Sequence, residues 1–308
     1  MVRVYCVGDN NVDIYLHTGT VYPGGSCVNV AAAVSQCGHK AAFVSTVGND
    51  RLGDLQADSL RAVGVDVSHL HRIDAQTPWC FITVKDGERI FGRNCVQARR
   101  ELPISVEDVR RGQNGEWDLL YTCSDAFYAP GAIEQFGRSD YPAVCDFTTR
   151  WTEESLREGC RHFSHPYLSC EQLTEAQVQQ LLGRCVDEWG AKLAVGTMGM
   201  RGSMVYNGRK FYRQKAYPVQ TVDTLGAGDS FLATFTVCYF DGLKLLRSWQ
   251  TGEQGIRADS EGFLACEDRL IEKSLAFAAL RAARTCQDYG GFGHGIPFEK
   301  EMIDETAI

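Results

Sequence analysis

At residues 222–231 the chain reads Val222-Asp223-Thr224-Leu225-Gly226-Ala227-Gly228-Asp229-Ser230-Phe231, and the apolar run 232–240 follows directly. The run predicts a long helix, so Gly226 and Gly228 place several backbone N–H groups at a helix N-terminus without side-chain bulk, where they can hold an anion. Asp229 would lie inside that anion site, where a carboxylate can accept a proton from a hydroxyl nucleophile during phosphoryl transfer. The alternative is an aspartate that only caps a buried helix.

Working outward from this stretch, apolar runs of strand length alternate with helical stretches, which is typical of βαβ units and a largely parallel sheet. Strands are expected at 2–7, 41–47, 119–122, 143–147 and 193–197, and helices at 28–37, 50–62, 174–189 and 273–286. Since the sequence has no internal repeat, low-complexity tract or Pro-rich linker, we predict a single α/β domain over residues 1–308.

Two stretches depart from this alternation and predict β-hairpins. The segments 79–84 and 88–92 flank an Asp-Gly turn, and 203–206 and 210–213 flank Asn207-Gly208. Hairpins inserted into a parallel core often act as flaps, so the first is a lid candidate. The charged segment 243–272, which holds three glycines, predicts an insertion before the last helix.

Composition excludes several classes of protein. With Lys+Arg 31 against Asp+Glu 39, the net charge of −8 argues against binding to nucleic acid or to acidic membranes. Hydrophobic residues at 44% and charged residues at 23% are typical of a globular chain rather than a disordered one. No stretch approaches the roughly 18 uninterrupted apolar residues of a membrane span.

The thirteen cysteines include no C-x-x-C pair and are spread evenly. That spacing favours neither a zinc site nor a disulfide scaffold. Together with an N-terminus that lacks the apolar stretch of a signal peptide, it predicts a reduced, cytoplasmic protein whose cysteines are small buried hydrophobic residues.

A second glycine-rich turn, Thr197-Met198-Gly199-Met200-Arg201-Gly202, follows an expected strand. Ligands bind beyond the carboxyl ends of strands in open α/β sheets, so this turn can lie against a nucleotide; a plain tight turn before the second hairpin is the alternative. Neither glycine stretch matches the P-loop pattern, and G-x-G-x-x-G is missing after the first strand, which disfavours a P-loop enzyme and a nicotinamide-dependent dehydrogenase.

Polar residues crowd the end of the first expected strand at Asp9, Asn10, Asn11 and Asp13. Carboxylates and amides can pair with sugar hydroxyls, and Asn29, one helical turn beyond Gly24-Gly25, can reach the same place. The alternative is that these residues only cap turns and helices.

Together these motifs resemble those of the ribokinase-like, or PfkB, family of carbohydrate and nucleoside kinases, from Val4 to about Gly295. The two stretches that carry the resemblance are the motif at 223–231 and Pro23-Gly24-Gly25-Ser26-Cys27-Val28-Asn29-Val30-Ala31 with Val47-Gly48-Asn49-Asp50. Within the family, four short strings look most like the fructoselysine 6-kinases of bacteria: 8–15, 22–25, Arg89-Ile90-Phe91-Gly92 and Cys145-Asp146-Phe147.

The resemblance implies a three-layer α/β/α fold with a mostly parallel central sheet and a small β lid from residues 14–22 and 79–96, often with a dimer formed through the lids. It also implies Mg2+-dependent transfer of the γ-phosphoryl group of ATP to a primary hydroxyl. By this resemblance, Asp229 is the base, and the N–H groups of Gly226, Ala227 and Gly228 form the anion hole. The sugar is held by Asp13, Gly25, Asn29 and, more weakly, Asn11. The nucleotide site is lined by Thr197, Gly199 and Gly202, and a monovalent cation binds at Asp223 and Thr224.

One position departs from the family pattern. The usual N-x-x-E, which supports Mg2+, is matched here by Gln172-Leu173-Thr174-Glu175, so Glu175 is expected to act on the metal through water. An acid in the first turn of a helix is the alternative for Glu175. Arg93 is a further candidate for an anionic substrate group or a phosphate, against an exposed lid arginine that meets only water.

The sequence therefore predicts an ATP-dependent kinase for fructoselysine or a related fructosamine. Its alternatives are another kinase of the same fold, acting on 2-keto-3-deoxygluconate, fructose or a nucleoside, and a non-catalytic protein that senses a sugar or nucleotide. The intact Gly226-Ala227-Gly228-Asp229 disfavours the sensor, because a protein that only binds has no need of the aspartate.

Overall fold

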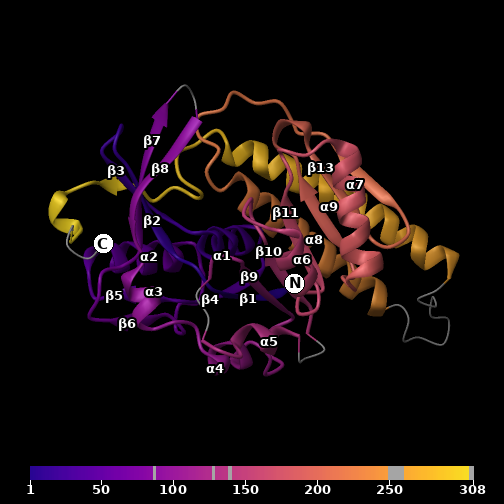
Figure 1. The fold of residues 1–308 in the computed structure, drawn as a ribbon, viewed down its shortest axis with the longest axis horizontal. Coiled ribbons are helices and arrows are strands. Elements are labelled where there is room, and N and C mark those ends of the chain that lie inside the picture. The colour runs from indigo at the N-terminus through magenta and orange to yellow at the C-terminus, as the bar shows by residue number, and fades with distance from the viewer. Residues whose placement is uncertain (86–87, 127–128, 138–140, 249–259, 305–308) are drawn as a thin grey trace.

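An eight-stranded central sheet forms the middle layer of the protein, seen in the computed structural model of Figure 1. The structure describes residues 1–308 apart from 86–87, 127–128, 138–140, 249–259 and 305–308. The strand order is β14 (Phe211–Gln214), β13 (Ser203–Tyr206), β12 (Ala194–Thr197), β11 (His165–Ser169), β10 (Ala143–Asp146), β9 (Leu119–Cys123), β1 (Arg3–Val7) and β4 (Lys40–Val44). Neighbours from β12 to β4 run parallel, and the predicted second hairpin, β13 with β14, adds the antiparallel edge.

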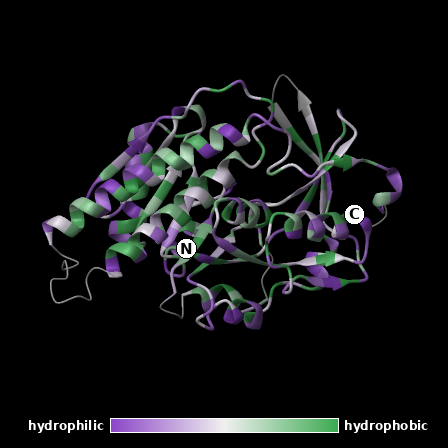
Figure 2. Ribbon diagram, turned by 180° about the vertical axis from the view of Figure 1, so that it is seen from behind, coloured by the Kyte–Doolittle hydropathy of each residue, from purple (hydrophilic) through white to green (hydrophobic). Residues whose placement is uncertain are grey.

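Helices cover both faces of this sheet because its strands are apolar on both sides. In β1, Val4 and Cys6 belong to one buried cluster, and Tyr5 and Val7 belong to the other. One face is covered by α1 (Ser26–Gln36), α8 (Ala227–Ser248) and α9 (Glu261–Thr285), and the other by α4 (Val106–Arg111), α5 (Ala132–Phe136), α6 (Glu153–Gly159) and α7 (Glu175–Gly183). Figure 2 shows the elements at the centre of the molecule mostly in green, the hydrophobic end of the scale. The predicted three-layer α/β/α architecture is confirmed.

A second, five-stranded sheet stands beside the central one, with the order β15 (Ile296–Pro297), β3 (Thr20–Gly24), β2 (Asn11–Tyr15), β7 (Trp79–Lys85) and β8 (Glu88–Cys95). It contains the predicted first hairpin, and the tip at 86–87 lies outside the described residues. A small core of its own holds it, built from residues such as Val12, Ile14 and Trp79 together with Leu52 of α2 (Arg51–Ala62).

The expected strand 41–47 is wrong in one respect, because two strands in different sheets replace it. The chain bends at Ser45, which is buried and donates its hydroxyl to the carbonyl oxygen of Gly8 at 2.6 Å. Beyond the bend, β5 (Thr46–Gly48) pairs with β6 (His71–Ile73) in a separate two-stranded sheet. The short helix α3 (Gln97–Glu101) packs near β5.

The expected start of the last helix, at residue 273, is also wrong, while the insertion at 243–272 stays a prediction. Helix α8 continues to Ser248, and α9 begins at Glu261, not at residue 273. Both ends are helical because buried Leu243, Leu246 and Phe263 pack into the core while the charged residues point outward. The part at 249–259 lies outside the described residues.

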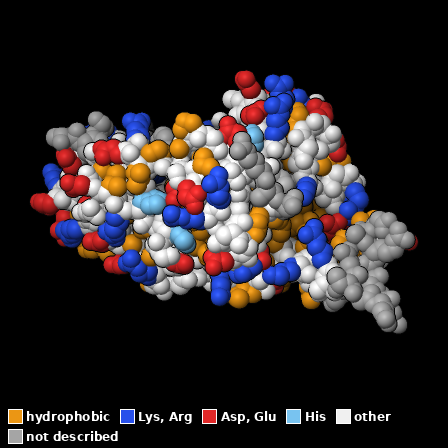
Figure 3. Space-filling view, turned by 90° about the horizontal axis from the view of Figure 1, so that it is seen from below, with side chains coloured by type: hydrophobic (Ala, Val, Ile, Leu, Met, Phe, Trp, Pro, Cys, Tyr) orange, Lys and Arg blue, Asp and Glu red, His pale blue; other side chains and the backbone are white. Residues whose placement is uncertain are grey.

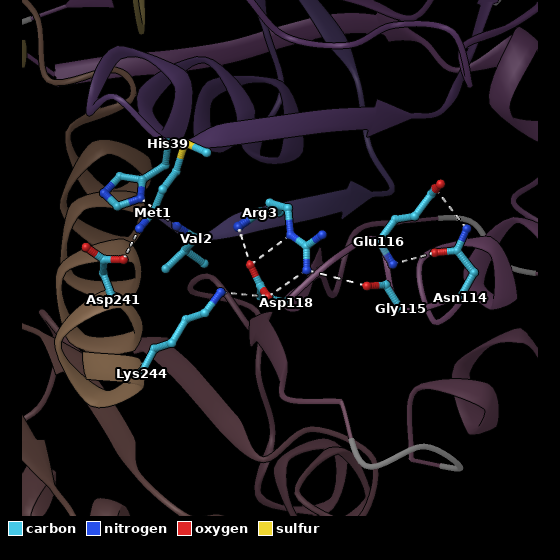
Figure 4. A network of polar contacts seen from close by, with 10 residues as sticks. All are labelled: Met1, Val2, Arg3, His39, Asn114, Gly115, Glu116, Asp118, Asp241 and Lys244. Carbon is cyan, nitrogen blue, oxygen red and sulfur yellow. Dashed lines mark hydrogen bonds and ion pairs between the residues drawn. The ribbon is translucent and has the colours of Figure 1, made fainter. Parts of the chain in front are cut away.

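A network of polar contacts holds the amino-terminal end of the sheet (Figure 4). Arg3 donates to both oxygens of Asp118, at 2.9 Å to Oδ1 and 3.1 Å to Oδ2, and Lys244 of α8 reaches Oδ1 at 3.3 Å. Partial burial alone would raise the pKa of Asp118, but the hydrogen bonds from Arg3 and Lys244 lower it to about 2. This carboxylate therefore stays ionised and ties β1 to α8 at the edge of the sheet where the strands begin.

The surface and the cysteines agree with the composition. Figure 3 shows Lys and Arg interspersed with Asp and Glu over the face turned to the viewer. In the part of the chain that the structure describes, no helix is both long and apolar enough to cross a membrane. All thirteen cysteines lie in that part and have free thiols, nine of them buried.

Candidate active site

The candidate site lies beyond the carboxyl ends of the central strands, where β1 has β4 on one side and β9 on the other. A ligand crevice is expected at such a switch in strand order. Asp9, which follows β1, accepts hydrogen bonds from the N–H groups of Ser26 at 3.1 Å and Cys27 at 2.9 Å. Since the N-cap residue of α1, Gly25, has no capping side chain, Asp9 performs that task and fixes the glycine turn.

The glycine turn packs directly on β2, the strand that carries Asp13. A Cβ on Gly24 would lie 2.0 Å from Oδ2 of Asp13, and one on Gly25, whose φ is +99°, would lie 2.8 Å from Cα of Asn10. Asn11 donates its Nδ2 to Oδ1 of Asp13 at 2.8 Å, which orients the buried carboxylate. The predicted sugar residues Asp13, Gly25 and Asn11 are thus brought together.

Two predicted residues that are 200 positions apart also meet. Asn29, on α1, donates its Nδ2 to Oδ2 of Asp229 at 2.8 Å. Asp229 lies in the first turn of α8. The hydrogen bond therefore holds the predicted base at a fixed place beside a predicted sugar residue.

The loop before α8 has the shape of an anion site. Gly226 has a φ of +72°, and its Cβ would lie 2.5 Å from Cα of Gly291, so only glycine fits this position. Ala227 opens the helix, and a Cβ on Gly228 would meet nothing within 4 Å. The first N–H groups of a helix lack partners within the helix; here the N–H of Ala227 donates to the carbonyl oxygen of Thr224 at 3.3 Å, and the space beside Gly228 is open.

A cavity of about 380 Å³ adjoins this loop. Of the residues predicted to bind the nucleotide, the lining includes Thr197, Gly199, Gly202 and Gly228 but not Gly226, and it also includes Thr224 and Ala227. Apolar walls come from Phe231, Tyr217 and the small side chains of α9: Ala279, Ala282 and Ala283. The volume is in the range of ordinary small-molecule sites, and the walls suit a flat, largely apolar group.

Glu175, the residue predicted to act on the metal, lies outside the cavity lining. Glu175 follows the N-cap Thr174 of α7, as expected, but it forms an ion pair with Arg213 of β14. The cavity lining includes Glu171 and neither Gln172 nor Glu175, and a Cβ on Gly199 would lie 2.3 Å from Oε1 of Glu171. The role of Glu175 on a metal stays a prediction, and Glu171 is a residue that the sequence reasoning missed.

Asp146, the last residue of β10, was also missed as a site residue. Burial, and next the charge of Asp229, raise the pKa of Asp146 to about 7. Burial and the charge of Asp9 likewise raise the pKa of Asp125, which follows β9. The signal that could have found Asp146 is its position at the carboxyl end of a strand.

Asp223 is held by protein donors on both of its oxygens. Oδ2 accepts from the hydroxyl of Tyr15 at 2.6 Å and from the N–H of Gly290 at 3.1 Å, and Oδ1 accepts from the N–H of Leu225 at 3.0 Å. Neither Tyr15 nor Gly290 was predicted as a site residue. The double glycine after the last helix was the available signal for the second of these.

Arg93 is exposed on β8, two strands away from β2 and Asp13. Its role on an anionic group stays a prediction.

Known proteins support this picture. The chain matches the pfkB family of carbohydrate kinases over residues 1–133 and 168–254. It is 28% identical to the fructosamine kinase FrlD of Bacillus subtilis over 97% of this chain and 96% of that protein. It is 29% identical to fructoselysine 6-kinase of Escherichia coli over 80% and 92%, respectively. The ribokinase of Arabidopsis thaliana, solved with ribose and ATP, superposes with a TM-score of 0.73 at 20% identity over 95% of each chain, which shows a shared fold. The chain therefore belongs to the pfkB family of carbohydrate kinases and is a phosphotransferase that acts on a sugar hydroxyl.

Proposed function

We propose that the protein transfers the γ-phosphoryl group of ATP to a primary hydroxyl of fructoselysine or a related fructosamine. The observation that carries the proposal is the 2.8 Å hydrogen bond from Asn29 to Asp229, next to the glycine loop and the cavity. The names of the Bacillus and Escherichia relatives support the substrate class.

Different residues bind ATP, bind the sugar and accept the proton. ATP occupies the cavity, with its phosphates against the N–H groups of Gly226, Ala227 and Gly228. Asp13 and Asn29, with Gly25 and Asn11, hold the sugar, so its hydroxyl faces Asp229. That hydroxyl oxygen forms a bond to the γ-phosphorus, the bond from the phosphorus to the leaving oxygen of ADP breaks, and Asp229 accepts the proton. Positioning and charge stabilisation supply most of the rate gain.

Mg2+ fits the chemistry of this site, because Glu171 lines the cavity and offers the oxygen ligands that a hard cation prefers. When bound with ATP, Mg2+ neutralises charge on the phosphates. Glu175 would act on it through water. A monovalent cation near Asp223 and Thr224 would order the loop before α8.

We also propose a cytoplasmic enzyme that dimerises through the second sheet. Large apolar side chains are exposed there at Leu16, Ile90 and Phe91, the last with 62% of its surface accessible. Side chains of this kind are suited to an interface between two copies. The sheet would then act as the predicted lid, formed by 14–22 and 79–96.

The deciding experiment changes Asp229→Asn. Turnover should fall by roughly 10²–10⁴, the usual contribution of a general base. Calorimetry should show nucleotide binding nearly unchanged. The matched control is Asp58→Asn, an exposed carboxylate on α2, which should keep full activity. Substantial turnover in Asp229→Asn would refute the assignment of the base.

A screen of fructoselysine, fructose, ribose, 2-keto-3-deoxygluconate and adenosine fixes the substrate. Activity on no glycated amine would reject fructosamines in favour of another kinase substrate. Sugar binding without ADP release from Mg-ATP would favour the sensing protein.

A further inference from the structure

Tyr15 connects the second sheet to the phosphate loop. It lies on β2, two positions after Asp13, so the two side chains share a face of the strand. Its side chain is almost completely buried, with 1% of its surface accessible, and its hydroxyl donates to Oδ2 of Asp223 at 2.6 Å. The strand that carries a sugar residue is thereby bonded to the segment that leads into α8.

Asp223 connects Tyr15 to the loop itself. Its other oxygen accepts from the N–H of Leu225, the residue just before Gly226. The position of the Asp223 carboxylate therefore determines where the chain enters the glycine loop. A displacement of Tyr15 therefore acts on the loop through the side chain of Asp223.

The turn at Gly290 and Gly291 fills the space behind the loop. The N–H of Gly290 donates to Asp223, and a Cβ on Gly290 would lie 2.7 Å from the Tyr22 ring. A Cβ on Gly291 would lie 2.3 Å from Oδ1 of Asn29. The loop at Gly226, the sugar residue Asn29 and the aromatic side chains of the second sheet are thus packed against one turn.

We infer that Tyr15 is a positioning residue that couples sugar binding at Asp13 to the order of the phosphate loop at 223–229. This inference rests on the proposed function, because it assigns the sugar to the face of β2 that Asp13 and Tyr15 share. The hydroxyl of Tyr15 already holds Asp223, so a sugar that fixes β2 against the central sheet stabilises this contact and, through it, the loop geometry that binds the γ-phosphate. Each ligand then raises the affinity of the other by the same factor.

The test is Tyr15→Phe, which removes only the hydroxyl, with calorimetry of a non-hydrolysable ATP analogue in the presence and absence of the sugar that the enzyme phosphorylates. In the unmodified protein the sugar should tighten analogue binding several-fold. In Tyr15→Phe this factor should fall toward one and turnover should drop about tenfold, the worth of one hydrogen bond. The affinity for sugar alone should change less than about threefold, since no sugar contact is removed.

Tyr22→Phe is the matched control. Tyr22 packs on Tyr15 with ring centroids 5.2 Å apart, but the loss of its hydroxyl leaves the bond from Tyr15 to Asp223 in place. This variant should keep the coupling factor. An unchanged factor in Tyr15→Phe, or an equal loss in both variants, would overturn the inference.

Amide hydrogen exchange gives a readout that needs no substrate. Exchange at residues 223–229 should be faster in Tyr15→Phe than in Tyr22→Phe, and equal exchange would also overturn the inference. If no sugar is phosphorylated, the proposed function fails while this measurement still decides the link from Tyr15 to the loop.

Discussion

Replacing Asp146 with asparagine tests the electrostatics of the site through the stability of the whole protein. Asn keeps an oxygen that can accept the N–H of Thr148, which Oδ1 of Asp146 accepts at 2.8 Å, so the change removes the charge and little else. The pKa of Asp146 rises from its ordinary value of 3.8 to about 7 because of burial and then the charge of Asp229. Ionising this group in the folded state is therefore costly.

The sign of the effect follows from linkage. The folded protein binds this proton more tightly than the unfolded chain, so the stabilising contribution is fully present below about pH 4 and is lost as the pH rises through 7. Between the two pKa values, each pH unit removes about 1.4 kcal/mol. From pH 5 to pH 8 the loss should be about 1–3 kcal/mol for this half-buried group.

Urea unfolding at pH 5 and pH 8 measures this loss in the free energy of unfolding. Asp146→Asn should be more stable than the unmodified protein at pH 8, and the difference between the two should grow by that amount between the two pH values. In the background of Asp229→Asn the growth should shrink, because one cause of the raised pKa is gone. A difference that does not change with pH would refute the reasoning.

Three glycine substitutions test the geometry of the loop and the cavity. Gly226→Ala should lower the free energy of unfolding by about 1–2 kcal/mol or more, because φ is +72° and the new Cβ meets Cα of Gly291, while Gly228→Ala should leave stability nearly unchanged in the same urea titration. Equal losses in the two would contradict this account. Gly199→Ala should raise the KM for ATP several-fold and leave the KM for sugar unchanged, because its φ is +57° and its Cβ meets Glu171 in the cavity. Steady-state kinetics with each substrate varied in turn measures the two KM values. A shift in the KM for sugar alone would show that Gly199→Ala does not act through the cavity.

Local chemistry explains which parts of the structure the sequence predicts. Asn207-Gly208 predicts the hairpin of β13 and β14 because that dipeptide suits a tight turn. Asp50, as an N-cap that accepts from Gly53, predicts the start of α2. The glycine motif predicts the start of α8 and the place of Asp229 for the same kind of reason. Each signal lies within a few residues of the feature that it predicts.

What the sequence misses depends on contacts between distant segments. Tyr15 and Asp223 are 208 positions apart, and nothing near either residue indicates the other. Strand β15 forms because Ile296 pairs with Val21 on β3, a contact between distant segments. Glu171 and Glu175 are one helical turn apart in sequence, and only the fold decides which of them lines the cavity.

The long separations within the site have a consequence for biosynthesis. Gly290, which bonds to Asp223, and Gly291, which packs behind Asn29, come after the last long helix. A nascent chain can form β1, α1 and β2 early, yet its catalytic centre stays incomplete until the segment beyond α9 has left the ribosome. Such non-local contacts also make folding slow. The enzyme therefore becomes competent late, because the segments made earlier lack the backbone groups beyond α9 that hold Asp223 and pack behind Asn29.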